Sequence, residues 1–213
     1  YYNQGKNNNN LYMKKFYNIV SFVFQPLLMP TYGIAMLINL DVFEIYSTTW
    51  KIVALLGTLL FTGLLPATPI LLLMKKGEVH DLFISRREER TMPYLFSFLA
   101  YTFWSFFLYK VLQLPLFMVG MGIGTATSIL LITFINLKWK ISAHLSGIGG
   151  LAGGVFGICY RMAYNPLLLL IVILLLSALV AVSRIGLKAH TPGQTLAGFL
   201  LAFFSVFIPC ILL

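Results

Sequence analysis

Long stretches without a charged residue alternate with short polar connections along this chain. A bilayer's hydrocarbon core of about 30 Å needs roughly 20 helical residues per span. Seven apolar stretches reach or approach that length: residues 16–40, 52–74, 94–109, 111–137, 145–160, 162–183 and 191–213. Pro26 and Pro30 are expected to kink the first stretch, and Pro115 to mark a turn near the start of the fourth. The pattern predicts an all-α fold, a polytopic transmembrane helix bundle with seven spans, or six if one short stretch is re-entrant.

The N-terminal dozen residues differ from the rest. Residues 1–12 are rich in Tyr and Asn without apolar periodicity, so we expect a disordered or artificially added tail. Met13 and the two lysines after it, just before the first apolar stretch, resemble a natural start. That stretch is too long for the apolar region of a cleaved signal peptide and lacks a small-residue cleavage site. Residues 13–213 are then expected to form a single transmembrane helical domain.

The composition excludes an ordinary soluble domain. Hydrophobic residues make up 59% of the chain and charged residues 10%, whereas a soluble domain is usually about 25% charged. The net charge of +9 does not predict nucleic-acid binding, because the cations lie in short runs between apolar stretches, as in cytoplasmic membrane loops. Cys159 and Cys210 lie inside apolar stretches without a Cys or His at ligand spacing, so they are interpreted as small core side chains.

Small residues are concentrated in the fifth apolar stretch, which contains six glycines. They form two ladders with four-residue spacing: Gly149, Gly153 and Gly157, and Ser146, Gly150 and Gly154. Such ladders let helix backbones approach closely where lipid removes the hydrophobic driving force. The favoured interpretation is a central packing helix, and a substrate groove against it is the secondary one.

All three histidines are expected on one membrane face. If successive spans reverse direction, this face receives the N-terminus and residues 75–93, 138–144 and 184–190. His80, His144 and His190 fall there with most of the arginines. A single ionisable group at a helix end is usually an interfacial anchor, but convergence from three loops favours a functional site.

The order of these residues carries a resemblance. Ser183 and Arg184 are followed by His190 after five residues, and Gly198 comes eight residues later. Upstream stands Ser142-Ala143-His144, and before it Arg86 and Arg90, with Pro93 three residues after Arg90. This resembles the membrane-bound type-2 phosphatidic acid phosphatase superfamily, which shares its site with vanadium haloperoxidases. The family's motifs are K-x6-R-P, P-S-G-H and S-R-x5-H-x3-D, so the resemblance covers roughly residues 75–213.

The resemblance implies phosphoryl transfer without a cofactor or metal. His190 would be the nucleophile and would form a phosphohistidine. His144 would be the acid for the leaving lipid oxygen and then the base for water. Arg184 and Arg90, with Arg86, would bind the phosphate oxygens. Ser142 and the backbone N–H of Ala143 would also donate to the phosphate.

The sequence departs from the family at Gln194, which stands where the family has Asp. One helical turn from His190, its carbonyl can accept a bond from the imidazole N–H but brings no negative charge. Asp81, Glu88 or Glu89 from the first loop are candidates for the missing carboxylate. No lysine precedes Arg90 at the family's spacing, because Phe83 is there.

Three functions remain open. The first is an integral membrane lipid-phosphate phosphatase acting on a phosphomonoester or diphosphate, such as a polyprenyl diphosphate or a phosphatidyl phosphate. The second is a catalytically weak or inactive relative that binds or transports a phosphorylated lipid. Both histidines favour the enzyme, and Gln194 favours the binder. An unrelated transporter ranks last, because the spans contain few ionisable groups. The expected partners are membrane lipid and the phosphorylated lipid, and the sequence does not indicate an oligomeric state.

The charge distribution and the resemblance predict opposite sides of the membrane for the site. Twelve of the 15 Lys and Arg residues lie on the membrane face that carries the histidines, and three lie on the other face. When the site candidates Arg86, Arg87, Arg90 and Arg184 are left out, eight basic residues remain on the first face against three on the second. The positive-inside rule then predicts a cytoplasmic site in the inner (plasma) membrane. Most membrane members of the family face their site outward, which a re-entrant first stretch would reproduce.

Overall fold

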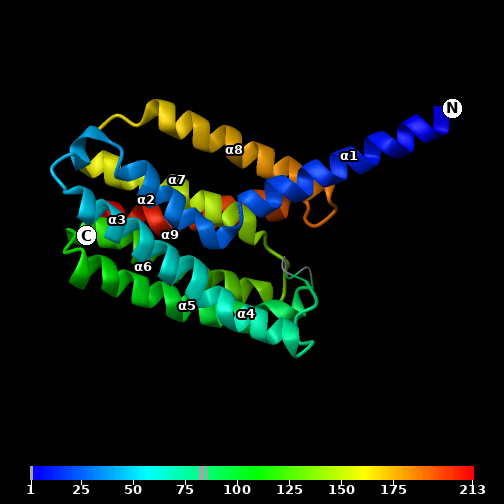
Figure 1. The fold of residues 1–213 in the computed structure, drawn as a ribbon, viewed down its shortest axis with the longest axis horizontal. Helices are drawn as coiled ribbons and strands as arrows, with labels where there is room; N and C mark the ends of the chain where they lie inside the picture. Colours follow the sequence, from blue (N-terminus) through cyan, green and yellow to red (C-terminus); the bar gives the residue numbers. More distant parts are fainter. Residues whose placement is uncertain (1, 82–83, 85) are drawn as a thin grey trace.

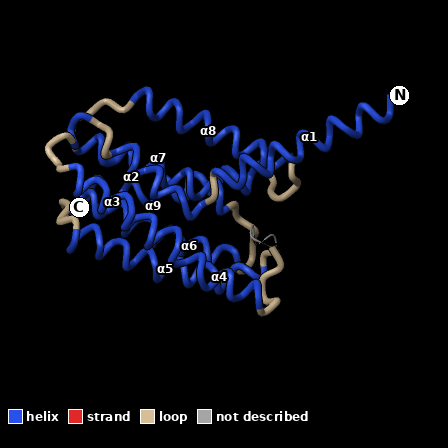
Figure 2. The backbone as a smooth tube through the Cα atoms, in the orientation of Figure 1, coloured by secondary structure: helices blue, strands red, loops and turns tan. Residues whose placement is uncertain are grey.

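The computed structural model describes residues 2–81, 84 and 86–213, with the side chains of residues 2–10 left out. The described residues are mostly helical and contain no strand (Figure 2). The elements are α1 (Tyr2–Val23), α2 (Met29–Leu37), α3 (Thr48–Thr58), α4 (Leu65–Lys75), α5 (Thr91–Phe106), α6 (Leu116–Asn136), α7 (Ala143–Arg161), α8 (Leu167–Gly186) and α9 (Pro192–Leu212). They confirm the predicted all-α bundle.

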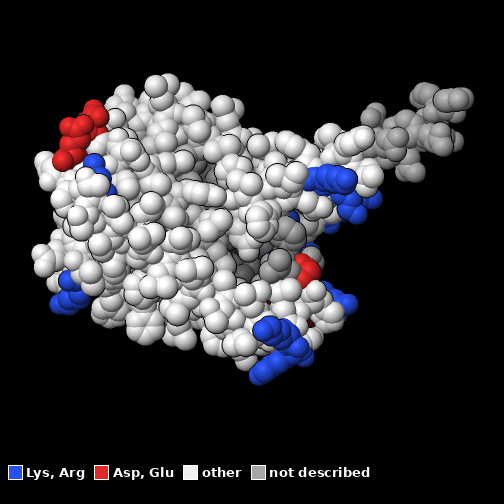
Figure 3. All heavy atoms as spheres, in the orientation of Figure 1, with Lys and Arg blue, Asp and Glu red and all other residues white. Residues whose placement is uncertain are grey.

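Six helical segments within the described residues are long and apolar enough to cross a membrane: Leu11–Leu37, Thr48–Lys75, Leu116–Asn136, Ala143–Arg161, Leu167–Gly186 and Pro192–Leu212. The stretch expected at 94–109 forms α5, continued by a π-helical turn at Phe107–Val111, and it lies beside α4 and α6 (Figure 1). Charged side chains gather at the two ends of the bundle and leave the middle of the visible face uncharged (Figure 3). The chain is an integral membrane protein.

Pro26 and Pro115 interrupt the helices where the sequence predicts, whereas Pro30 lies in the first turn of α2 and does not kink it. Because a residue before proline is pushed out of the helical region, Gln25 is extended (φ −65°, ψ 136°) and α1 ends at Val23. After a short 3₁₀ turn at Pro26–Leu28, α2 continues toward the far end of the bundle (Figure 1). Pro115 is the N-cap of α6, so the fourth stretch becomes helical only from Leu116. Residues 2–12 belong to α1, and the expectation of a tail at 1–12 stays a prediction; Tyr1 lies outside the described residues.

The bundle is centred on α7, which packs most extensively against α9 and also touches α2, α6 and α8. An added Cβ on Gly149 would lie 2.2 Å from the carbonyl oxygen of Phe199, and one on Gly153 would lie 2.3 Å from that of Phe203. This face of α7 therefore requires glycine, because the α9 backbone occupies the space of a side chain. The preferred interpretation of a central packing helix agrees with this contact.

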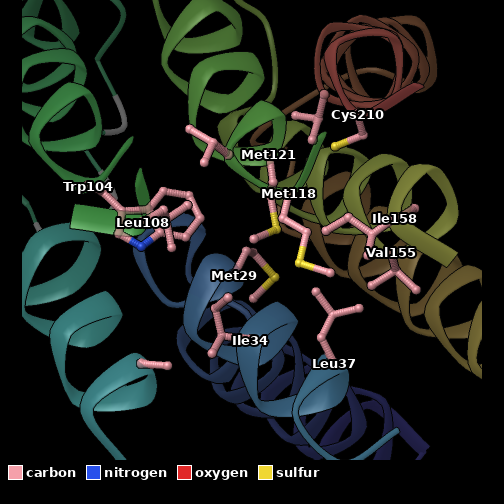
Figure 4. Close-up of a cluster of buried hydrophobic side chains, with 14 of the residues drawn as sticks. Met29, Ile34, Leu37, Trp104, Leu108, Met118, Met121, Val155, Ile158 and Cys210 are labelled. Atoms are coloured by element: carbon pink, nitrogen blue, oxygen red, sulfur yellow. The ribbon is translucent and has the colours of Figure 1, made fainter. Parts of the chain in front are cut away.

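Large apolar side chains line the space between α2, α5, α6 and α7 (Figure 4). Met29 and Ile34 of α2 meet Met118 and Met121 of α6 there, and Trp104 of α5 closes one side (Figure 4). The Trp104 indole N–H donates to Thr58 Oγ1 at 3.0 Å, so its polar edge is satisfied in the interior. Both cysteines are buried thiols, as expected.

Candidate functional site

The three predicted site loops meet at the bundle end where α1 emerges (Figure 1). They are the segment between α4 and α5, the connection from α6 to α7 and the turn from α8 to α9. A cavity of about 260 Å³ opens there, and Arg90, Ala143, His144 and His190 line it together with apolar side chains. Residues from three loops far apart in sequence thus share one cavity.

His190 is held by the start of α9. Thr191 is the N-cap of that helix, and Gln194 completes a capping box with it. Gln194 Oε1 accepts a hydrogen bond from the Thr191 backbone N–H (3.2 Å) and another from His190 Nδ1 (3.1 Å). A carbonyl oxygen only accepts, so Nδ1 carries the proton and Nε2 keeps its lone pair.

The surroundings of His190 keep the ring neutral. The side chain is 7% exposed, and burial is the main cause that lowers its pKa to about 3. The positive charges of Arg90, Arg184 and Lys140 act in the same direction, while the hydrogen bond to Gln194 opposes them. At neutral pH His190 is therefore an uncharged imidazole with an unprotonated Nε2.

Arg90 is fixed by backbone carbonyls. Its Nε donates to Ile84 O (2.8 Å), and one terminal nitrogen donates to Ile141 O (3.1 Å). The side chain is 3% exposed and lines the cavity. A guanidinium has five N–H donors in a planar fork, so donors remain for an anion in the cavity after these two bonds.

Arg184 stands in the last turn of α8 and is also 3% exposed. Its positive charge interacts electrostatically with both His144 and His190. The charges of Asp81 and Arg90 interact with Arg184 in the same way. Two buried guanidinium groups near one another repel, and an anion between them would relieve that repulsion. The pair therefore favours an anionic ligand.

His144 lies in the first turn of α7, which Ser142 caps through a bond from the Leu145 N–H to Ser142 Oγ (3.5 Å). The side chain is 5% exposed, and its Nε2 donates to the carbonyl of Ser21 at 3.1 Å. That carbonyl lies in the last turn of α1, where helical carbonyls lack an N–H partner within the helix. The break caused by Pro26 thus supplies the acceptor that holds the His144 ring.

The second and third motifs are joined by backbone contacts. The Ser142 N–H donates to the backbone carbonyl of Gln194 at 3.3 Å. An added Cβ on Gly198 would lie 2.7 Å from the carbonyl oxygen of Ser142, so only glycine permits this approach. Ser142 is fully buried. Ala143, the first residue of α7, lines the cavity, and its N–H has no acceptor within the helix.

Glu88 and Glu89, in the segment between α4 and α5, pair with groups other than His190. Glu89 bonds to the backbone N–H (3.0 Å) and Nδ1 (2.7 Å) of His80, and it pairs with Arg86 at 3.5 Å. Glu88 is exposed and pairs with Arg87, while Asp81 acts on Arg184 and Lys140. The group that orients His190 is Gln194. Arg86 is an exposed side chain outside the cavity wall.

Lys140 is a further cation of this site, and it lies outside the three family motifs. Burial lowers its pKa, and the charges of Arg90 and Arg184 lower it further, against the opposing charges of Asp81 and Glu88. Its charge in turn acts on His190. The signal in the sequence was its position two residues before Ser142, immediately before the motif that ends in His144. Within the described part of the chain, no group of three or more Cys, His, Asp or Glu side chains is arranged to hold a metal ion.

Comparison with known proteins gives one finding. The family model of the PAP2 superfamily matches residues 133–211, which include the second and third motifs. No curated protein and no solved structure matches the chain. The match confirms over these residues the resemblance drawn from the motifs: this region of the chain is similar to the PAP2 superfamily, the type-2 phosphatidic acid phosphatases.

Proposed function

We propose that the protein is a lipid-phosphate phosphatase that works through a phosphohistidine at His190. The observation that carries the proposal is the hydrogen bond from His190 Nδ1 to Gln194, which leaves a neutral ring with Nε2 unprotonated at the cavity. Such a nitrogen is a competent nucleophile toward phosphorus. The apolar remainder of the cavity wall suits a substrate that brings a hydrocarbon group along with its phosphate.

The first half-reaction transfers the phosphoryl group to the enzyme. His190 Nε2 attacks phosphorus while the bond from phosphorus to the lipid oxygen breaks. His144, protonated when the anionic substrate binds, gives its proton to the departing lipid oxygen and becomes neutral. That oxygen takes the place of the Ser21 carbonyl as the acceptor of the His144 N–H.

The second half-reaction releases phosphate. Water attacks the phosphohistidine and gives a proton to His144, and the bond from phosphorus to Nε2 breaks. Charge in both transition states spreads over three phosphate oxygens, so catalysis rests on positioned donors and cations. Arg90, Arg184 and Lys140 supply the cations, and the Ala143 N–H supplies a donor.

A lipid-phosphate binder without turnover is the second candidate, favoured by the lack of charge on Gln194. A binder needs the cations but has no use for the unprotonated nitrogen of His190. Phosphate release from a lipid panel therefore separates the two candidates.

Replacing His190 by Ala is expected to abolish phosphate release by the purified protein in detergent, because no other group on the cavity wall replaces the nucleophile. His80→Ala removes an exposed histidine of the first loop, which pairs with Glu89 outside the cavity, and should keep wild-type turnover. Vanadate should inhibit the wild type. Release at the wild-type rate from folded His190→Ala protein would exclude His190 as the nucleophile.

Gln194→Glu is expected to raise turnover about 10-fold or more. The glutamate can keep both hydrogen bonds of the amide oxygen and adds a negative charge beside His190 Nδ1. In serine proteases the reverse change at the orienting carboxylate lowers turnover about 10⁴-fold. Gln194→Leu, which removes the acceptor, should lower turnover below the wild type. If Gln194→Glu has unchanged or lower turnover, the charge next to Nδ1 does not limit the reaction.

We place the site on the cytoplasmic side of the inner (plasma) membrane, because its bundle end also carries the N-terminal helix and most of the basic residues. A single cysteine at Lys138, in a background without Cys159 and Cys210, should resist an impermeant thiol reagent in intact cells. A cysteine at Glu44, at the other end, should react. Labelling at 138 with protection at 44 would place the site outside.

A further inference from the structure

A second cavity continues from the site into the interior of the bundle. It has a volume of about 100 Å³ and is called the inner cavity below. It shares five wall residues with the site cavity: Pro26, Leu27, Tyr94, Ser97 and Ala143. The inner cavity therefore begins directly behind the place where the phosphate would lie.

The inner cavity is long and narrow. Along α5 its wall runs from Tyr94 to Trp104, ten residues that span about 15 Å at the helical rise. The wall also includes Ile132 and Met121 of α6, the neighbouring helix, which runs antiparallel to α5 (Figure 1). A length of ~15 Å is about half of the bilayer's hydrocarbon thickness, which is the depth that one lipid chain fills.

Three of the hydroxyl groups on this wall are turned back to their own helices. Ser97 donates to Pro93 O (2.9 Å), Thr125 to Met121 O (2.6 Å) and Ser146 to Ser142 O (2.9 Å). Their polar atoms are thereby satisfied, and the wall consists mainly of hydrocarbon and of small residues such as Gly150. A cavity of this kind favours an apolar guest over water.

The site cavity opens sideways toward the lipid. Phe22 of α1 and Leu71 of α4 line it and are 63% and 49% exposed. The main packing partner of α1 is α8, on the far side from α4 (Figure 1). A lipid can therefore bring its phosphate to Arg90 from the bilayer without crossing water.

We propose that the substrate is the phosphate ester of a single hydrocarbon chain, that this chain lies in the inner cavity, and that Ser128 and Gly150 set how far it enters. The inference rests on the proposed phosphatase function. A volume of about 100 Å³ spread along ~15 Å of α5 leaves room for one hydrocarbon chain, and the second tail of a diacyl lipid has no place beside it. Trp104, fully buried and bonded to Thr58, closes the far end.

The test compares butyl, octyl, dodecyl and hexadecyl phosphate with a diacyl phosphatidate as substrates of three variants. Ser128→Leu places a larger side chain in the inner cavity. Gly150→Ala adds only one methyl group to the wall and therefore reduces the volume of the inner cavity by less. The added Cβ would lie 3.5 Å from Val206, which is an ordinary van der Waals contact. The matched control is Thr127→Leu, next to Ser128 but exposed on the outer side of α6.

In the wild type, kcat/KM should rise from butyl to dodecyl phosphate, and phosphatidate should be the poorer substrate. Ser128→Leu should lower the dodecyl-to-butyl ratio of kcat/KM about 10-fold, the loss expected when about two methylenes leave the apolar contact. Gly150→Ala should change that ratio in the same direction by less, and Thr127→Leu should leave it as in the wild type. The inference would be overturned if kcat/KM depended on chain length in the same way in Ser128→Leu and Thr127→Leu. It would also be overturned if phosphatidate were hydrolysed as well as dodecyl phosphate.

A binding measurement separates this inference from the phosphatase proposal. Alkylphosphonates of the same chain lengths carry a bond from carbon to phosphorus that phosphatases do not cleave. Chain-dependent phosphonate binding that Ser128→Leu weakens, without phosphate release from any ester, would support the inner cavity and overturn the phosphatase. Phosphate release without any effect of chain length would support the phosphatase and overturn the inner cavity.

Discussion

The close approach of α7 and α9 determines how the two histidines of the site lie relative to one another. Gly149 and Gly153 let the α9 backbone lie where side chains would otherwise be, and Gly198 does the same for the carbonyl of Ser142. The N-termini of the two helices therefore start side by side, one carrying His144 and the other held against His190. Without this contact the two histidines would sit on helix ends whose separation nothing fixes.

The site carries an excess of buried positive charge. Arg90 and Arg184 are each 3% exposed, the partly buried Lys140 lies near them, and His190 is kept neutral by burial and by these cations. The carboxylates of Glu88 and Glu89 pair with partners other than His190. Buried cations without an anion between them destabilise the folded protein, and a bound phosphate offsets this cost. The phosphate also brings a negative charge beside the two histidines.

The apolar pattern predicted the fold well, because lipid demands uncharged helical stretches and prolines interrupt helices wherever they occur. It predicted less about pairing: the ladder of Gly149 and Gly153 indicated close packing, but any neighbouring helix could have used it. The role of Gln194 as an acceptor followed from its spacing to His190. The bond from His144 to the Ser21 carbonyl did not, since it depends on how a helix end 123 residues away is placed. Lys140 resembled an interfacial anchor, because sequence alone does not show burial.

The central claim is that His190 attacks phosphorus through Nε2, because Gln194 holds Nδ1. The most direct measurement is rapid acid-free quenching of the protein during turnover of a lipid phosphate, followed by phosphopeptide mass spectrometry and ³¹P NMR. We predict a phosphoryl group on His190, bonded to Nε2, in the wild type. A phosphoryl group on Nδ1, on another residue, or on no residue while phosphate is being released would contradict the claim.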